Sequence, residues 1–201
     1  MLEQIHPKIH RIQGYSETAH PAVLKKIVER EQLELVGNFH RNRHRKMAFT
    51  SGTYDMIHVG HVRYLELARS LGDVLIVGLN SDKSVKAYKD PTRPILGENR
   101  RAEMLAALSS VDFITLYDET TADEIIRILR PDAYLCVEGS WAEGTDLETK
   151  AEVQAMLEHG GEVFLSPRQE PGLSTSAIIA QLEKNGETRT RRKIMQLLQE
   201  E

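Results

Sequence analysis

The fold of this chain is decided by the stretch Met47-Ala-Phe-Thr-Ser-Gly-Thr-Tyr-Asp-Met-Ile-His-Val-Gly-His-Val-Arg-Tyr-Leu65. Its first four residues form a short apolar segment that predicts a buried strand. After it, Val62, Leu65 and Ala68 recur at helical spacing. The motif His58-Val-Gly-His61 therefore lies where a strand turns into a helix.

Such a junction favours phosphate binding, because free backbone N–H groups and the positive end of a helix dipole point at the ligand. Gly52 lets the backbone approach a ligand closely, and Gly60 keeps the first helical turn slim. Two imidazoles three residues apart, His58 and His61, lie on one helix face and can point at the same anion. The alternative places one histidine on the surface and the other in the core. The glycine between them and the upstream Gly-Thr-Tyr-Asp favour a functional pair.

These residues resemble the signature of the nucleotidyltransferase superfamily of the cytidylyltransferase type, whose members carry an H-x-G-H motif. Such enzymes join a nucleoside monophosphate from ATP or CTP to a phosphorylated acceptor and release pyrophosphate. The resemblance continues to about Gln181, roughly two-thirds of the chain. It implies a nucleoside triphosphate and a phosphorylated small molecule as substrates, with Mg²⁺ as cofactor. It also implies a homodimer, because family members are commonly dimers.

The composition narrows the function classes. A net charge of −4 argues against a nucleic-acid-binding surface as the main role. The lone Cys136 excludes an internal disulfide, fits a reducing compartment and lies in an apolar run typical of a core. No stretch has the length of a membrane span, and the N-terminus lacks a signal-peptide pattern. We therefore expect a cytoplasmic protein without a membrane partner.

Apolar strands alternate with amphipathic helices from Met47 onward. Strands are predicted over 47–50, 74–79, 113–117, 133–137 and 162–165. Helices are predicted over 59–71, 97–109, 122–129, 150–159 and, as the final core helix, 174–182. This alternation predicts an α/β fold, a doubly wound Rossmann-like parallel sheet with helices on both faces. Ligands of such sheets bind at the carboxyl ends of the strands, where His58 and His61 would lie.

Two segments flank the predicted nucleotidyltransferase domain, which covers residues 47–182. Residues 1–46 form an N-terminal extension with a helix predicted over 21–35. Its basic stretch, within residues 38–46, is interpreted as a solvated linker, with a phosphate-attracting patch as the alternative. Residues 183–201 are charge-rich with a late apolar cluster and predict a helical tail that packs on the body or on a partner.

A second group of candidate residues follows the second predicted strand, in a stretch read as a loop over residues 80–95. Lys86, Lys89 and Arg93 within it can surround a polyphosphate, since charge-assisted hydrogen bonds suit the charge that builds up during nucleotidyl transfer. Lysines and arginines in a loop are usually just solvated. Their place one strand after the histidine pair, on the same edge of the sheet, favours function.

Two further segments complete the set. Of Arg100 and Arg101, the spacing to Leu105 and Leu108 places Arg101 on the buried side of its helix and favours it as the site residue. The hydroxyls of residues 174–176 precede an apolar helix. Ser174 can be an ordinary N-cap, and hydroxyls with free N–H groups at a helix start also bind phosphate.

Taken in order, these segments are similar to the adenylyltransferase domain of the bifunctional ADP-heptose synthase family, which converts D-glycero-β-D-manno-heptose 1-phosphate and ATP to ADP-heptose. The chain departs from that family over residues 137–141, where Val-Glu-Gly-Ser-Trp replaces a Lys-Gly-Gly-Asp-Tyr-like segment. Trp141 resembles an aromatic residue of some cytidylyltransferases. It can stack on a base or pack as core, and we assign it to the acceptor site.

The resemblance implies catalytic roles for His58, His61, Lys89 and Arg101. The nucleotide-binding set that it implies is Thr50, Ser51, Gly52, Thr53, Tyr54, Asp55, Gly60, Asn80, Lys86, Arg93, Glu138, Ser174, Thr175 and Ser176. Asp55 can orient a histidine, touch metal or bond turn amides. No residue set is assigned to a metal.

In the predicted mechanism, Mg²⁺ and the cations hold the triphosphate while the already ionised acceptor phosphate attacks the α-phosphorus. No general base is needed, so catalysis is positioning plus electrostatic stabilisation. Three alternatives use the same residues differently: a cytidylyltransferase acting with CTP on a polyol phosphate such as glycerol 3-phosphate, an FAD synthetase-type enzyme joining AMP to FMN, and a non-catalytic nucleotide sensor.

Overall fold

The computed structural model describes residues 20–89, 92–138 and 146–197. Its core is a sheet of five parallel strands in the order β3-β2-β1-β4-β5. The strands are β1 Met47–Gly52, β2 Val74–Asn80, β3 Phe113–Tyr117, β4 Ala133–Val137 and β5 Glu162–Ser166. The predicted doubly wound sheet is thus confirmed, with strand bounds within two residues of those expected.

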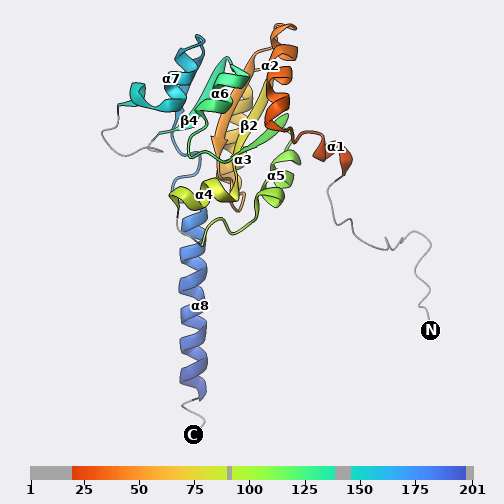
Figure 1. The fold of residues 1–201 in the computed structure, drawn as a ribbon. Coiled ribbons are helices and arrows are strands. Elements are labelled where there is room, and N and C mark those ends of the chain that lie inside the picture. The colour runs from red at the N-terminus through yellow and green to blue at the C-terminus, as the bar shows by residue number, and fades with distance from the viewer. Residues whose placement is uncertain (1–19, 90–91, 139–145, 198–201) are drawn as a thin grey trace, which may run out of the picture.

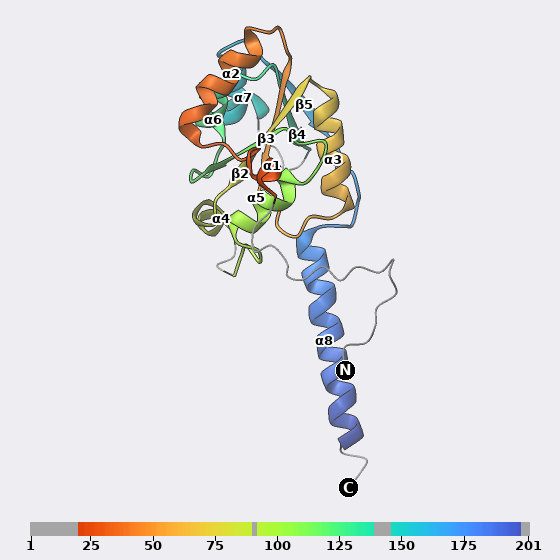
Figure 2. The same ribbon diagram turned by 90° about the vertical axis from the view of Figure 1, so that its right-hand side faces the viewer.

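Helices cover both faces of this sheet, as the turned view shows (Figure 2). Against one face pack α3 (Val59–Ser70) and α5 (Glu98–Ala106); against the other pack α2 (Leu33–Arg41), α6 (Asp123–Leu129) and α7 (Ala151–Leu157). Strand alternation explains this division, because Met47 and Phe49 of β1 point into one core cluster and Ala48 into the other. Cys136 is buried in the core, as expected.

One predicted loop is partly a helix. Residues Asp82–Tyr88 form α4 directly after β2, where the polar sequence had indicated a loop. The helix begins because the Ser81 hydroxyl accepts a hydrogen bond from the Ser84 amide at 3.1 Å, which satisfies a free N–H of the first turn. The loop expectation was therefore wrong for this segment, and a capping serine was the overlooked signal.

The N-terminal extension also differs from prediction, because the helix expected over 21–35 is interrupted. It is replaced by α1 (Pro21–Leu24), the short 3-10 helix η1 (Arg30–Gln32) and the start of α2. Between α1 and η1 the chain runs beside β3, where the Val28 amide donates to the Ile114 carbonyl at 2.8 Å and the Ile114 amide to the Lys26 carbonyl at 2.8 Å. Pairing with the sheet edge overrides the local helical pattern.

The last helix leaves the body of the molecule. A single helix, α8 (Thr175–Leu197), projects away from the sheet (Figure 1). The segment 174–182 was expected to be a core helix, but only its start is buried and Leu182 is 59% exposed. The predicted tail from residue 183 is the continuation of this helix. Within the described ranges, no helix is both long and apolar enough to cross a membrane.

Candidate active site

The carboxyl end of β1 turns sharply into α3. Tyr54 and Met56 adopt positive φ angles of 48° and 54°, a region that non-glycine residues seldom enter. The Tyr54 ring folds back over Gly52, where an added Cβ would lie 3.1 Å from the ring. Backbone strain of this kind persists only where the surrounding structure holds it, and it gathers at functional sites.

Asp55 holds this turn in place. Its buried carboxylate accepts hydrogen bonds from the amides of Ile95 at 2.8 Å and Leu96 at 3.0 Å, and it pairs with Arg93 at 3.1 Å. The Asp55 carbonyl accepts a hydrogen bond from the Thr175 hydroxyl. Of the roles considered for Asp55, the structure shows the bonding of backbone amides, here from a loop about 40 residues away.

The two motif histidines stack on each other at the start of α3. Their ring centroids are 3.9 Å apart with an interplanar angle of 22°. The Nδ1 atoms of His58 and His61 are buried without a hydrogen-bond partner among the described residues. Buried polar atoms normally have partners, so an unpartnered pair on one helix turn indicates a place for a ligand.

Burial lowers the pKa of both imidazoles. For His61, desolvation, the neighbouring His58 and the positive charge of Lys89 lower the pKa to about 4, while Asp55 acts in the opposite direction. For His58 the cause is burial alone. Both rings are therefore neutral near pH 7, and each carries one N–H that can donate to an anion.

Gly60 lets a distant loop cross the start of α3. A Cβ at this position would lie 3.1 Å from the His58 ring and 3.2 Å from the Cβ of Glu170. Glu170 belongs to the segment between β5 and α8 and forms an ion pair with Arg63 of α3. The glycine of the motif thus allows the β5–α8 loop and the histidine pair to share one small space.

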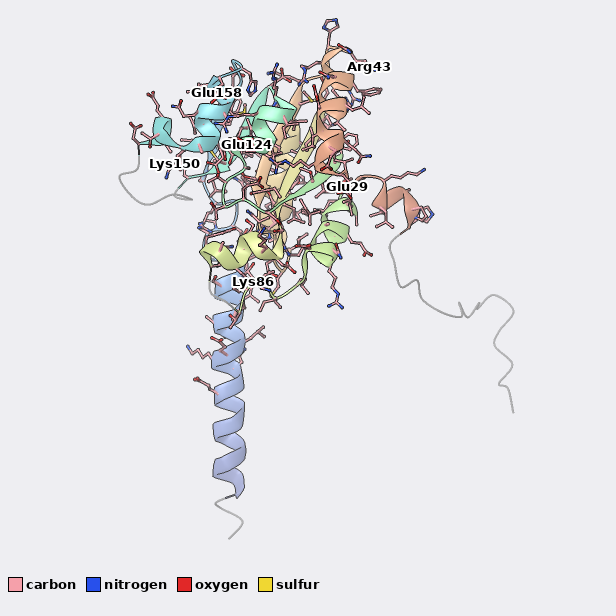
Figure 3. All side chains as sticks on the ribbon, viewed as in Figure 1. Glu29, Arg43, Lys86, Glu124, Lys150 and Glu158 are labelled. Atoms are coloured by element: carbon pink, nitrogen blue, oxygen red, sulfur yellow. The ribbon has the colours of Figure 1, made fainter. Side chains whose placement is uncertain are left out.

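The cations of the second group differ in their surroundings. Lys89, at the end of α4, donates a hydrogen bond to the Thr53 hydroxyl at 3.0 Å, and its pKa is lowered by burial and then by Arg93. Arg93 is mostly buried beside Asp55, and its Nε has no partner among the described atoms. Lys86 lies on the exposed side of α4 (Figure 3). The structure thus brings Lys89 and Arg93 into contact with Thr53 and Asp55 of the strand–helix turn, and Lys86, like Lys89, is exposed.

Arg101 is fully buried, as its spacing predicted. Its guanidinium donates to the Thr53 carbonyl at 2.6 Å, to the Leu96 carbonyl at 2.9 Å and to Asp82 at 2.7 Å. Two segments distant in the chain, at Thr53 and Asp82, therefore meet on this one side chain. These contacts make Arg101 a residue that holds the site together, rather than a cation whose donors are free for a ligand.

Polar residues at the strand ends are bonded among themselves. Thr50 bonds to Tyr64 and to the Leu135 carbonyl, both at 2.9 Å, inside the core. At the end of β1, the Ser51 hydroxyl lies 3.3 Å from that of Tyr134. Thr50 and Ser51 therefore bond to opposite faces of the sheet, beneath the strand–helix turn.

The start of α8 supplies the last predicted segment. Ser174 caps the helix, accepting from the Ala177 amide at 3.1 Å; Thr175 is buried against the motif turn, and Ser176 is exposed. Glu138, just after β4, is exposed, and its amide bonds to the Ser166 carbonyl at 2.8 Å. Trp141 lies outside the described residues.

Tyr88 was not among the predicted site residues, although the structure places it there. Its hydroxyl lies 2.7 Å from the Thr53 hydroxyl and donates to Asn80 at 3.3 Å. The nearest sequence signal was its position immediately before Lys89. A tyrosine in a presumed loop carries no motif, so only the fold reveals its contacts.

Comparison with known families finds that a model described as cytidylyltransferase-like matches residues 49–181. Among curated relatives, bifunctional protein HldE of Syntrophotalea carbinolica is 42% identical over 159 residues, covering 78% of this chain and 31% of the relative. Bifunctional protein HldE of Methylobacillus flagellatus is 44% identical over 142 residues, covering 71% of this chain and 28% of the relative. The chain thus spans about a third of the length of these relatives.

Solved structures share the fold at lower identity. The lipopolysaccharide core biosynthesis protein from Thermoplasma volcanium GSS1 aligns with a TM-score of 0.52 and 22% identity, over 62% of this chain and 98% of that protein. Pantoate-beta-alanine ligase from Francisella tularensis aligns with a TM-score of 0.50 and 16% identity, over 74% of this chain and 70% of that one. At these identities the likeness supports the Rossmann-like architecture alone.

Proposed function

Because the chain belongs to the cytidylyltransferase-like family of nucleotidyltransferases, we propose that it transfers AMP from ATP to a sugar 1-phosphate resembling D-glycero-β-D-manno-heptose 1-phosphate. The choice of acceptor is supported by the identity to the HldE proteins over most of this chain and by the ordered resemblance to the adenylyltransferase domain of ADP-heptose synthases. The match covers 31% and 28% of these relatives, so their second activity is not carried over.

The stacked pair His58 and His61 carries this proposal. Two neutral imidazoles with unpartnered nitrogens lie at the positive end of the α3 dipole, close enough to Lys89 for its charge to affect His61. The helix dipole and Lys89 make this place electropositive, and the imidazole Nδ1 atoms lack hydrogen-bond partners among the described residues. The phosphate oxygens of a nucleoside triphosphate supply negative charge and hydrogen-bond acceptors.

In the proposed reaction, an ionised phosphate oxygen of the acceptor attacks the α-phosphorus of ATP. A new P–O bond forms as the bond to the bridging oxygen of the β-phosphate breaks, and pyrophosphate leaves with the electron pair. No proton is transferred, so the protein contributes position and electrostatics. The N–H groups of His58 and His61, with the Lys89 ammonium, stabilise the charge that builds on the phosphoryl oxygens.

Other predicted residues act through these. Arg101 holds the Thr53 carbonyl and Asp82 together, and Asp55 anchors the loop that carries Arg93, so we assign both to positioning. The hydroxyl of Thr175 is engaged by the motif turn. The far phosphates are therefore bound by Ser174, Ser176 and the first amides of α8, a helix long enough to have a full dipole.

Mg²⁺ enters this scheme with the nucleotide. Among the described residues, no group of three or more His, Cys, Asp and Glu side chains is placed to hold a metal ion. The carboxylate of Asp55 is occupied by Arg93 and by two amides. Mg²⁺ commonly keeps several waters and binds through substrate phosphates, so we treat MgATP as the substrate rather than assign a protein metal site.

Pyrophosphate release with Mg²⁺ tests the proposal, using ATP and CTP in turn against a sugar 1-phosphate panel, glycerol 3-phosphate and FMN. Turnover with ATP and heptose 1-phosphate is the expected result. Turnover with CTP and glycerol 3-phosphate alone would make the protein a cytidylyltransferase, and turnover with FMN an FAD synthetase-type enzyme. Nucleotide binding without any turnover would indicate a sensor. The assay is run under reducing, cytoplasm-like conditions, because we expect the protein to work in the cytoplasm.

A further inference from the structure

Tyr88 combines a buried hydroxyl with an open ring. The residue is 47% exposed, although its hydroxyl is bonded within the protein. Burial raises the pKa of this phenol, so it stays protonated and remains a hydrogen-bond donor. An aromatic ring held by its polar end while about half of the residue stays accessible is typical of residues that bind small ligands.

A directed chain of hydrogen bonds fixes the ring. The Lys89 ammonium donates to the Thr53 hydroxyl at 3.0 Å, which lies 2.7 Å from the Tyr88 hydroxyl; this in turn donates to the Asn80 side-chain oxygen at 3.3 Å. The Asn80 amide continues the chain to Ser84 at 2.9 Å. Each group has one orientation that satisfies both neighbours, so the chain holds Tyr88 and Lys89 in one arrangement.

The topology indicates which substrate Tyr88 meets. The strand order reverses between β1 and β4, and nucleotides bind in the crevice at such a switch point. Tyr88 lies on α4, which follows β2, on the other side of β1 from that crevice. The Lys89 ammonium lies over one face of the Tyr88 ring, 5.5 Å from its centroid. A molecule that presents a phosphate to Lys89 from this side would lie across the ring.

We propose that Tyr88 is a specificity-determining residue that binds the sugar ring of the acceptor by stacking. The inference rests on the proposed function and extends it to the recognition of a cyclic acceptor. A pyranose has a face of C–H bonds whose positively polarised hydrogens are attracted to the negative face of an aromatic ring. An acyclic polyol phosphate has no such rigid face, so the platform favours ring-shaped acceptors.

The test compares the wild type with three variants. Tyr88→Leu removes the platform, Tyr88→Phe keeps the ring and removes only its hydroxyl, and Phe39→Leu is the control. Phe39 is 46% exposed, so it matches Tyr88 in exposure. It lies on α2, which packs with α6 and α7 on one face of the sheet, away from the site. Thermal melts establish that each variant is folded. Steady-state assays then give kcat/KM for the sugar 1-phosphate at saturating ATP, and KM for ATP.

We expect Tyr88→Leu to lower kcat/KM for the sugar 1-phosphate by about tenfold or more, with the KM for ATP within about twofold of wild type. Tyr88→Phe should lose only a few-fold, because the ring remains, and Phe39→Leu should match the wild type. If Tyr88→Leu behaves like Phe39→Leu, or if its loss falls on the KM for ATP, the inference is wrong while the proposed function stands. A wild type inactive on every sugar 1-phosphate would instead overturn both.

Discussion

The two ends of the central sheet use positive charge in opposite ways. At the amino ends of the strands lies the basic stretch that joins α2 to β1. There Arg41 donates to the Leu129 carbonyl at 2.6 Å and Arg45 to the Asp73 carbonyl at 3.0 Å, both main-chain oxygens of the protein itself. Arg43, at the same end (Figure 3), lies 3.7 Å above the Phe39 ring. Arg41 and Arg45 thus attach the extension to the body, whereas Arg43 contacts its own helix.

At the carboxyl ends the polar groups have unmet capacity. The Nδ1 atoms of His58 and His61 lack partners within the described part of the chain, and Lys89 is shown bonded to a neutral hydroxyl rather than to a carboxylate. A basic side chain is a candidate for ligand binding only when its N–H donors are not already bonded to main-chain carbonyls. Residues 42–46 are exposed and join α2 to β1, in line with the solvated-linker interpretation, although Arg41 and Arg45 also donate to main-chain carbonyls.

The largest expected effect is on the catalytic rate, which should depend on the carboxyl ends of the strands and not on the amino ends. His61→Ala should lower kcat by about 10²- to 10³-fold, because it removes one preorganised donor to the phosphoryl group. Arg43→Ala, at the opposite end, should leave kcat unchanged. Pyrophosphate release measures both, and circular dichroism checks the fold. A near-normal rate for His61→Ala would remove the basis for assigning the site.

The second effect compares two lysines. Lys89→Met should lower kcat/KM by about 10- to 100-fold, since a charge-assisted contact to the phosphates is lost. Lys46→Met is the matched control, because Lys46 is exposed and lies 3.9 Å from Glu162 at the far end of the sheet. Equal rates for the two variants would show that Lys89 is a structural cation like those of the extension.

Much of this contrast was accessible from the sequence. The H-x-G-H motif, the strand–turn–helix junction and the buried side of Arg101 all follow from short-range spacing, and the structure shows the junction and that burial. Parallel strands with apolar runs were located within two residues because both faces are covered, which leaves an unambiguous pattern. The periodicity of apolar residues is sufficient to predict an element where its burial follows from its own sequence pattern.

The rest depends on contacts between distant segments. Arg101 is held by Thr53 and Asp82, 48 and 19 residues away, and no spacing rule relates these positions. The edge pairing of Val28 with Ile114 likewise joins residues that the sequence separates widely. Tertiary contacts of this kind override propensity, which explains the interrupted helix in the extension and the unpredicted contacts of Tyr88.

The desolvated imidazole of His61 should make the stability of the protein depend on pH. The folded pKa of His61 is about 4, below the ordinary value, so the unfolded chain takes up a proton first as the pH falls. Stability should therefore decrease below about pH 6.5 and lose about 2 kcal/mol between pH 7 and pH 5 from this group. His61→Asn should flatten this part of the curve in urea titrations. The remaining slope would come from His58 and His40, whose pKa values are also lowered by burial. An unchanged slope in the variant would mean that His61 is not desolvated.

The smallest expected effect is at the amino ends of the strands. There a substitution should lower stability and leave kcat unchanged, the opposite of what is expected for His61→Ala. Arg41 lies where Gly37 lets α2 approach α6 closely, since a Cβ on Gly37 would lie 2.7 Å from the Leu129 carbonyl oxygen. Arg41→Ala removes the donor that satisfies that carbonyl at the end of α6, which should cost about 1 kcal/mol of unfolding free energy. Arg43→Ala serves again as the control, because its guanidinium contacts its own helix. Urea unfolding should show the loss for Arg41→Ala with kcat unchanged. A loss of activity at unchanged stability would contradict the contrast, because it would make the amino end of the sheet part of the chemistry.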